Sequence, residues 1–515
     1  MEDRNLPGSP EEGEEKVAAA PTLDEVRAKI DQEVNALTAW VLSCESSIFL
    51  AFEIQLIIKV MDLGCLFVEL FLCMREAQFQ ATNPQPQPGY KRMDPKPRCL
   101  GTFFGKVRYW RTYFYREGGG YYPLDIELGL TGDGFSMLIQ SLAVRIATKM
   151  SYAQAVLILT LFLQWSPAQG SIESMVLGLG RHTGDWFEST PAPEGDGEVL
   201  VIQIDSKATP TATEEELEKR RGPRRENPHP GSQRHRRREA RKRRGSRKRR
   251  KKGDKSKNGK MATIVTMYTL KMSADGTLEG PINKKVYASY APKRHAVAIA
   301  RREADKRGFQ RGSGKVVQIV TDGDNDLERY IDEYFPEAEH TIDVYHVTEY
   351  IWEAGHCLHR EGSTELVEWV EEQKKALYDG RAAEIVEEID KQLKQLDPGK
   401  QGVRERLEKI RNYLNKRVDK MNYDELRERD LEISSGAVEG AVNYVIAKRF
   451  DSSGMRWVKE RAEHLLQLRC IEVNGDWDAF INFVHDRTQE QAQQQCKNLS
   501  LKRTKPAPLP TCGFI

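Results

Sequence analysis

The sequence lacks the features of a secreted, zinc-ribbon or membrane protein. Its eight cysteines include no CxxC pair and show no regular spacing, so we expect reduced thiols in a cytoplasmic protein. No basic segment followed by an apolar one opens the chain, so no signal peptide is predicted. The most apolar stretch, residues 46–74, is interrupted by Glu53, Lys59, Asp62 and Glu69, and it falls short of the roughly 18 uncharged residues of a membrane span. We therefore expect packed amphipathic helices there and no membrane contact.

The sequence also has little net charge, +2 over 515 residues, but the charges are unevenly distributed. Residues 219–260 hold 22 Lys or Arg against three carboxylates. A structureless loop of this length is uncommon unless it is functional or disordered, so we predict that this basic insertion lies along DNA and neutralises phosphates. The alternative is a disordered basic tail for nonspecific or RNA binding. The predicted DNA-binding residues are Arg236, Arg237, Arg238, Arg241, Lys242, Arg243, Arg244, Arg249, Arg250, Lys251 and Lys252.

Composition and periodicity divide the chain into regions. We predict a disordered acidic tail over 1–22, a helical region over 23–82, a DNA-binding region over 83–195, a catalytic domain over 196–485 and a flexible tail over 486–515. The catalytic domain would carry the basic insertion at 210–260 and an all-α insertion at 350–430.

The predicted DNA-binding region begins with a proline-rich stretch, residues 83–97, which is typical of a linker. Alternating aromatic and basic residues on either side of Gly118–Gly120 then predict a β-hairpin. Two apolar-periodic segments, 151–164 and 171–180, predict helices with the spacing of a helix-turn-helix, although most helical hairpins bind nothing.

Beyond residue 195 the hydrophobic period predicts the order β-β-β-α-β-α-β. The strands are expected at 198–204, 261–271, 284–290, 315–323 and 340–346, and the helices at 292–309 and 325–333. Three meandering strands followed by alternating helices and strands indicate an α/β, ribonuclease H-like core. In that arrangement the first and fourth strands are neighbours, so Asp205 and Asp322, which end them, should emerge together at one edge of the sheet.

Two neighbouring carboxylates repel each other, and a cation removes the repulsion while using their oxygens. Hard oxygen ligands favour Mg²⁺ or Mn²⁺, and two such ions can clamp the attacking and leaving oxygens of a phosphoryl transfer. For a third carboxylate the candidates are Glu432 and Glu439, and we choose Glu439 because small residues surround it. Asp324 or Asp326 could replace Asp322 if the strand ends later. The alternative for each of these carboxylates is a structural cap or turn.

Four stretches, taken in order, resemble one family: "QIDSKAT" with the basic insertion, "IVTDGDNDLERYI", "TIDVYHVTEYIWEAG" and "SSGAVEGAVNYVIAKRFDSSGMRW". Over roughly residues 95–485 the chain resembles the DDE transposases of bacterial insertion sequences, most closely the ISKra-type group. The resemblance implies a metal-binding triad of Asp205, Asp322 and Glu439. The sequence departs from the family pattern at Ser206, where family members often have glycine. Some relatives also carry a cysteine-containing hairpin, which this chain lacks.

The resemblance also implies supporting residues. Asp343 and His346 would form a D-x-x-H element on the strand after the second aspartate, with a structural hydrogen bond as the alternative. Arg449 and Trp457 would contact phosphate or a flipped base near the cleaved end.

The implied activity is Mg²⁺- or Mn²⁺-dependent cleavage and strand transfer at the terminal repeats of the element itself. The implied partners are double-stranded DNA and a second copy of the chain, at least as a dimer, in the bacterial cytoplasm at the nucleoid. The alternatives are a noncatalytic DNA-binding protein derived from a transposase and a ribonuclease H-like nuclease that cuts without joining. The all-α insertion could contact either DNA or the second subunit.

Overall fold

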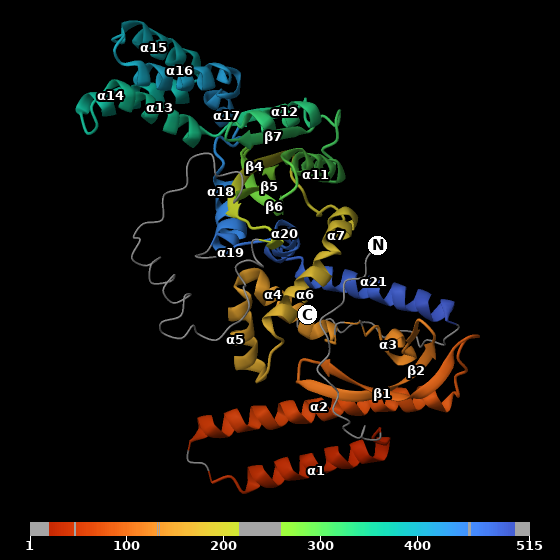
Figure 1. The fold of residues 1–515 in the computed structure, drawn as a ribbon. Coiled ribbons are helices and arrows are strands. Elements are labelled where there is room, and N and C mark those ends of the chain that lie inside the picture. The colour runs from red at the N-terminus through yellow and green to blue at the C-terminus, as the bar shows by residue number, and fades with distance from the viewer. Residues whose placement is uncertain are drawn as a thin grey trace, which may run out of the picture. The chain divides into compact units, whose positions relative to one another are not determined.

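The computed structural model describes residues 20–45, 48–130, 132, 134–215, 259–451 and 455–499. The eleven predicted DNA-binding residues lie outside these ranges, as do most of the predicted acidic tail and the end of the predicted flexible tail. The chain forms two compact units, Met1–Val176 with Trp477–Ile515, and Leu177–Asp476 (Figure 1).

The first unit opens with two long helices, α1 (Leu23–Leu42) and α2 (Phe49–Ala81). A capping box starts α1, because Thr22 accepts from the backbone N–H of Glu25 and the Glu25 carboxylate accepts from that of Thr22. Many apolar side chains of α2 stay partly exposed, among them Ile54 at 48% and Ile57 at 49%. Within the described ranges, no helix combines the length and apolar character that crossing a membrane requires.

A three-stranded sheet packs on α2. It consists of β1 (Lys91–Gly101), β2 (Lys106–Arg116) and β3 (Gly119–Tyr121), paired in that order. The hairpin predicted at the glycine run is confirmed as β2 and β3. The predicted linker over 83–97 is wrong in its second half, because residues 91–97 belong to β1. An edge strand tolerates proline, and the register shift between Met93 and Lys96 accommodates Pro95.

The remaining helices of this unit are α3 (Pro123–Glu127), α4 (Met137–Lys149), α5 (Tyr152–Leu163) and α21 (Trp477–Asn498); α6 (Gln169–Gly180) crosses into the second unit. The two predicted helices are therefore present as α5 and α6. A helix-turn-helix is not confirmed. The outer side chains of α5 are apolar, with Leu161 63% and Phe162 73% exposed, and α6 contains no Lys or Arg that could contact a base edge or phosphate.

The second unit is built on a five-stranded mixed sheet in the order β6-β5-β4-β7-β8. The strands are β4 (Val199–Pro210), β5 (Gly259–Met272), β6 (Leu278–Ser289), β7 (Val316–Thr321) and β8 (Glu339–Ile342). The predicted element order is confirmed, and β4 pairs in parallel with β7. A mixed sheet with this order is consistent with a ribonuclease H-like transposase domain.

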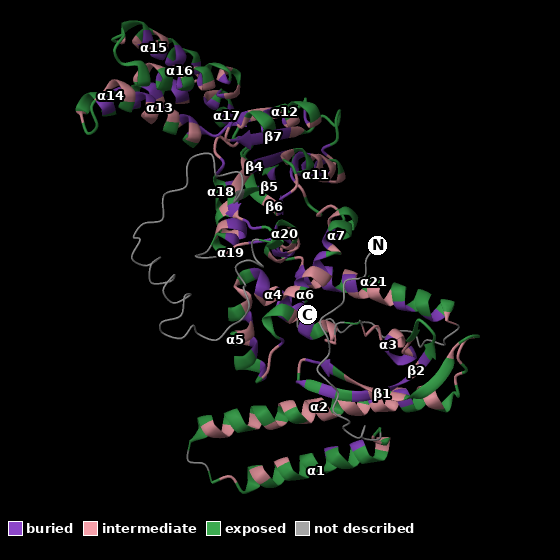
Figure 2. Ribbon diagram, in the orientation of Figure 1, coloured by how far each residue is buried: buried purple, intermediate pink, exposed green. Residues whose placement is uncertain are grey.

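Helices cover both faces of this sheet, which is why β4 and β7 are apolar almost throughout (Figure 2). One core contains Leu200, Ile202 and Ile319 against α11 (Lys293–Lys306) and α12 (Asn325–Tyr334). On the opposite face, Val199 and Val201 join a core that continues into the all-α insertion. A short helix, α7 (Thr183–Ser189), precedes the sheet.

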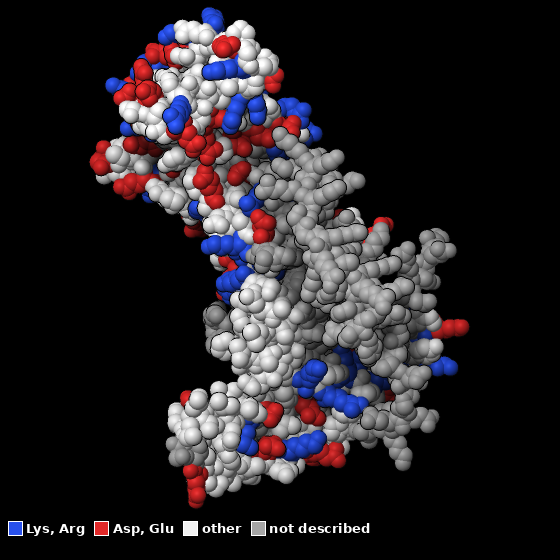
Figure 3. Space-filling view, turned by 60° about the vertical axis from the view of Figure 1, so that its left-hand side comes forward, with Lys and Arg blue, Asp and Glu red and all other residues white. Residues whose placement is uncertain are grey.

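The all-α insertion consists of α13 (Val344–Leu358), α14 (Thr364–Tyr378), α15 (Ala382–Gln395), α16 (Gln401–Asn415), a 3₁₀ turn (Val418–Lys420) and α17 (Tyr423–Glu428). The strand predicted over 340–346 is wrong in its second half. Asp343 accepts from the backbone N–H of Tyr345 and starts α13, so His346 lies in a helix. Both acidic and basic side chains lie on the face of the insertion that Figure 3 shows.

The chain then returns to the sheet through α18 (Gly436–Ala441), a π-helical turn (Val442–Ala447), α19 (Lys448–Phe450) and α20 (Lys459–Val473). The irregular segment before α18, residues 431–435, brings Glu439 toward the central strands.

Candidate active site

Asp205 and Asp322 lie at the same edge of the sheet. The last residue pair of the parallel β4–β7 ladder is Ile204 with Thr321, so the two aspartates directly follow this pair on neighbouring strands. The end predicted for the first strand is wrong, because β4 continues past Asp205 to Pro210 through its pairing with β5. Both side chains are half-buried. The juxtaposition expected from the element order is therefore present in the structure.

Glu439 approaches the same edge from α18 and is exposed. Burial raises the pKa of the Asp205 carboxyl. The backbone N–H of Ser206 and the charge of His346 oppose this shift, whereas the negative charges of Asp322 and Glu439 add to it. Asp322 and Glu439 thus lie close enough to Asp205 to disfavour its ionised form, which is the condition that a bound cation would relieve.

A second group of side chains gathers at this edge. One ligand atom each of Asp343, His346 and Glu439 lies within 4.8 Å of the others, a spacing that suits a metal ion. Among the described residues, Asp205 and Asp322 fall outside this close group. The sequence predicts Asp343 and His346 as supporting residues, and the structure brings both beside Glu439.

The oxygens of Asp343 already have donors. Its Oδ1 accepts from the Tyr345 N–H at 3.0 Å, and its Oδ2 accepts from Ser435 Oγ at 2.6 Å and from His346 Nδ1 at 3.0 Å. Burial raises the pKa of Asp343, but the hydrogen bonds from His346, Ser435 and Tyr345 outweigh it and hold the pKa below its usual value. Asp343 is therefore an ionised anchor at the start of α13.

His346 carries a positive charge at neutral pH. Its hydrogen bond to Asp343 raises its pKa to about 9 against the effect of burial, and the charges of Asp343 and Asp322 contribute. Because a protonated imidazole offers no lone pair, His346 is a poor metal ligand in this state. We therefore interpret Asp343 and His346 as an ion pair that braces the carboxylates, rather than as part of a ligand set.

The alternative carboxylates have other partners. Asp324 caps α12 through the backbone N–H groups of Asp326 and Leu327, and it forms an ion pair with Lys293 at 2.7 Å. Glu432 accepts a 2.9 Å hydrogen bond from Tyr268 Oη. These contacts favour structural roles for Asp324 and Glu432.

Arg449 and Trp457, the other predicted supporting residues, lie in the interior. Arg449 is 1% exposed, and its guanidinium lies 4.8 Å from the centre of the Trp457 ring. Trp457 donates from Nε1 to the carbonyl of Phe450 at 3.1 Å, and its backbone bonds to Pro210 and Ala212, at the end of β4. The pair secures the strand that carries Asp205, and its contact with DNA stays a prediction.

Some residues at the site were not predicted. The side chains of Gln203, Gln318 and Ser435 contact the segment that carries Glu439, and Tyr413 and Arg417 contact the loop that carries Asp322. The two glutamines had a visible signal, because each interrupts an apolar strand, in "VLVIQID" and "VVQIVTD". The contacts of Tyr413 and Arg417, and that of Ser435 with Asp343, have no local signal, since each joins residues more than ninety positions apart.

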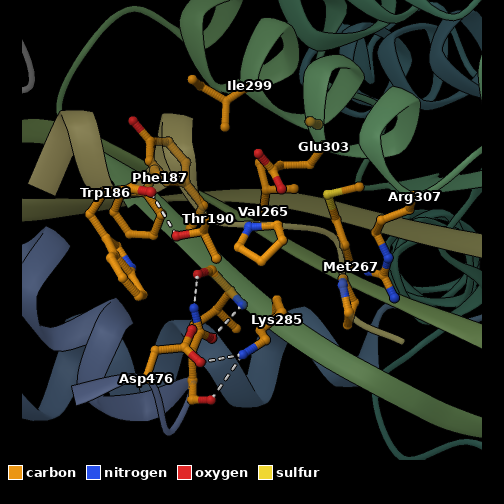
Figure 4. A pocket seen from close by; sticks show the side chains of 16 residues that line it. Trp186, Phe187, Thr190, Val265, Met267, Lys285, Ile299, Glu303, Arg307 and Asp476 are labelled. Carbon is orange, nitrogen blue, oxygen red and sulfur yellow. Dashed lines mark hydrogen bonds and ion pairs between the residues drawn. The ribbon is translucent and has the colours of Figure 1, made fainter. Parts of the chain in front are cut away.

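A separate pocket of about 70 Å³ lies on the α11 face of the sheet (Figure 4). Trp186, Phe187 and Val265 are among its lining residues. Its cations Lys285 and Arg307 are paired with Asp476 and Asp196, each at 2.6 Å. The volume holds only a few water molecules.

Two parallel central strands carry neighbouring carboxylates where their shared ladder ends, and a third carboxylate and an Asp–His pair lie beside them. This arrangement is consistent with a ribonuclease H-like transposase domain and includes an acidic cluster that could hold a divalent metal. Residues 290–500 match the family model of ISL3-type DDE transposases, described as a transposase. This part of the chain belongs to the DDE transposases of insertion sequences.

The match contains Asp322 and Glu439, while Asp205 precedes it. The ISKra-type subgroup that the sequence suggested is not confirmed. None of the curated proteins matches the chain.

Proposed function

We propose that this transposase cleaves and joins DNA strands at the terminal repeats of its own insertion sequence, with Asp205, Asp322 and Glu439 as the metal-binding carboxylates. The observation that carries the proposal is the parallel pairing of β4 with β7, which sets Asp205 beside Asp322. The electrostatic effect of Glu439 on Asp205 supports the third position.

The donor set fits Mg²⁺ or Mn²⁺. Three carboxylates supply hard oxygen ligands. Burial raises the pKa of Asp205, the negative charges of Asp322 and Glu439 add to this shift, and a divalent ion would neutralise these charges. When bound, such ions supply an activated water and stabilise charge on the phosphate oxygens. Soft ligands do not enter the group, so a zinc or copper site is disfavoured.

The chain's own residues would orient this chemistry. Asp343 anchors His346 and Ser435, and Ser435 Oγ lies 3.3 Å from Glu439 Oε1. His346 places a cation among Asp205, Asp322 and Glu439, which lowers their repulsion and would also attract the scissile phosphate.

The proposed partners are double-stranded DNA and a second copy of the chain. The basic insertion would contact phosphates beside the site, because it follows β4, the strand that carries Asp205, and the chain returns as β5. Cleaving two ends of one element implies at least a dimer.

The test uses the full chain with supercoiled plasmid that carries the DNA flanking its gene, in Mg²⁺, Mn²⁺ or EDTA. Asp322→Asn is compared with Asp326→Asn, an exposed aspartate in the first turn of α12. We expect metal-dependent nicked and joined products that vanish with Asp322→Asn and persist with Asp326→Asn.

Other results would separate the alternatives. Nicking without joined products would favour the nuclease. DNA binding without cleavage in either metal would favour the noncatalytic protein. Loss of activity in Asp326→Asn but not in Asp322→Asn would assign the second metal ligand to Asp326.

A further inference from the structure

Two buried glutamines lie on the central parallel strands. Gln203 on β4 is 1% exposed and Gln318 on β7 is fully buried. Val201 pairs with Gln318, and Gln203 pairs with Val320, so the two glutamines are diagonal neighbours on one face of the sheet. A buried amide costs free energy unless its donors and acceptor are satisfied, so their partners explain why they are there.

Gln318 holds both backbone groups of one residue. Its Oε1 accepts from the N–H of Glu432 at 3.0 Å, and its Nε2 donates to the carbonyl of Glu432 at 2.7 Å. Residues 431–435 belong to no helix or strand. The amide therefore substitutes for a neighbouring strand and fixes this segment over β7.

Gln203 holds the same segment at its other end. Its Oε1 accepts from the N–H of Val438 at 2.9 Å, and its Nε2 donates to the carbonyl of Ser434 at 3.0 Å. Val438 directly precedes Glu439. A primary amide can accept a hydrogen bond from a backbone N–H through its oxygen and donate one to a backbone carbonyl through its NH₂ group at the same time. Asparagine has the same amide, but its side chain is one methylene shorter than that of glutamine.

We infer that Gln203 and Gln318 are positioning residues that set Glu439 against Asp205 and Asp322, an inference that rests on the proposed function. Gln203 lies two residues before Asp205 on the same face of β4, so one strand both carries a ligand and holds the backbone beside another. Side chains that orient metal ligands typically change metal affinity or activity by about 10–100-fold when they are replaced.

The segment has further attachments, so the loss of one amide should shift Glu439 without unfolding the unit. The N–H of Val344 donates to the carbonyl of Ile433 at 3.0 Å, and Ser435 Oγ donates to Asp343 at 2.6 Å. The N–H of Val438 also keeps its bond to the Ser435 carbonyl. Methionine keeps the length of glutamine and removes the hydrogen bonds.

The experiment measures Mn²⁺ binding by electron paramagnetic resonance, and cleavage as a function of Mg²⁺ concentration, on the full chain. Gln203→Met and Gln318→Met are compared with Gln140→Met. Gln140 is a buried glutamine of the first unit that donates to the carbonyl of Phe135 at 2.9 Å. Thermal unfolding and DNA binding in EDTA are followed in parallel.

We expect Gln203→Met to weaken Mn²⁺ binding and to raise the half-saturating Mg²⁺ concentration by about 10-fold or more, with a smaller change for Gln318→Met. DNA binding in EDTA should be unchanged, and Gln140→Met should match wild type in metal dependence. A purely structural role would lower the melting temperature and leave the metal dependence of the folded protein unaltered.

A folded Gln203→Met variant with wild-type Mn²⁺ affinity would overturn the inference. If Gln203→Met does not fold, the Mn²⁺ affinity of Gln318→Met tests the inference instead, since this variant keeps both contacts of Gln203 with the segment. If wild type cuts DNA and the glutamine variants match it, the positioning role alone fails. If wild type neither cuts DNA nor binds Mn²⁺ in an Asp322-dependent way, the proposed function fails as well.

Discussion

The phenol oxygen of Tyr413 donates a 2.7 Å hydrogen bond to the backbone carbonyl of Asp322. Tyr413 belongs to α16 of the all-α insertion, which is thereby attached to the loop that carries a proposed metal ligand. Arg417 strengthens the attachment by donating to the carbonyl of Gly323 at 2.6 Å. The insertion is thus part of the support of the site, in addition to any role in contacting DNA or a second subunit.

This contact predicts a specific sensitivity at Gly323. Its φ is +78°, and an added Cβ would lie 2.5 Å from Tyr413 Oη and 2.9 Å from Arg417 Nε. Gly323→Ala should lower the free energy of unfolding by about 3 kcal/mol through backbone strain and the clash, and it should reduce cleavage by displacing Asp322. Urea unfolding and plasmid nicking measure the two effects.

Gly312 is the matched control, because its φ is +80° and an added Cβ there meets nothing within 4 Å. Gly312→Ala should cost only about 1 kcal/mol, from strain alone, with cleavage retained. Equal costs at the two positions would mean that Tyr413 and Arg417 do not press on the loop.

The salt bridge between Arg417 and Glu328 predicts a large stability effect. Both side chains are almost fully buried, at 3% and 4% exposure, and they meet at 2.6 Å. Arg417→Met should destabilise the protein by about 3–5 kcal/mol, because Glu328 keeps only the more exposed Lys416 and Lys420 as cations. Arg406 on α16 forms an exposed pair with Glu353 on α13, and Arg406→Met should cost far less stability than Arg417→Met. Comparable losses in denaturant unfolding would contradict this account.

Much of the catalytic core could be predicted from the sequence because its strands are buried on both faces. Almost continuous apolar runs such as residues 199–204, interrupted only by Gln203, differ clearly from amphipathic helices, so the element order follows from the hydrophobic period. That order was enough to bring Asp205 and Asp322 together. The prediction for residues 343–346 is wrong because "HTIDVYH" has the composition of a strand throughout. In the structure the strand ends at Ile342, where Asp343 caps the start of α13.

Long-range partners could not be predicted. Gln203 meets Val438 and Gln318 meets Glu432 across more than one hundred residues, and no local pattern encodes such pairs. Residues 91–97 were expected in a linker because of their prolines, yet they form an edge strand, where a missing N–H need not break the sheet. Tertiary context decided both cases.

The ion pair of Asp343 with His346 predicts a pH-dependent stability. The folded-state pKa of His346 is raised from 6.5 to about 9, so its stabilisation is fully present below about pH 6.5 and is lost as the pH rises through about 9. Since the imidazole side chain is 38% exposed, solvent screening limits the contribution to about 1 kcal/mol.

Unfolding of wild type and His346→Gln in EDTA measures this effect. The difference between them should be largest near pH 6 and should vanish near pH 10. His356→Gln, in the last turn of the same helix, is the control and should follow wild type. A difference that grows above pH 9 would have the wrong sign for this ion pair.

Asp205 predicts opposite effects on stability and activity. Its folded-state pKa is raised, chiefly by burial, so the ionised carboxylate destabilises the metal-free fold at neutral pH, and this cost decreases as the pH falls. Asp205→Asn should abolish cleavage and raise the melting temperature in EDTA by a few degrees, roughly 1 kcal/mol. Excess Mg²⁺ should stabilise wild type more than the variant. A variant less stable than wild type in EDTA would show that the carboxylate is held by favourable contacts.

The basic insertion predicts the salt dependence of DNA binding. Each phosphate contact adds about 0.9 to the magnitude of the slope of log affinity against log salt concentration. A triple alanine variant at Arg236, Arg237 and Arg238 should therefore reduce the magnitude of this slope by roughly 3. The control removes the same charge from the all-α insertion, at Lys391, Lys394 and Lys400. Fluorescence anisotropy with labelled terminal DNA in EDTA gives both slopes. An unchanged slope in the arginine variant, with a reduced one in the lysine variant, would place the phosphate contacts on the all-α insertion instead.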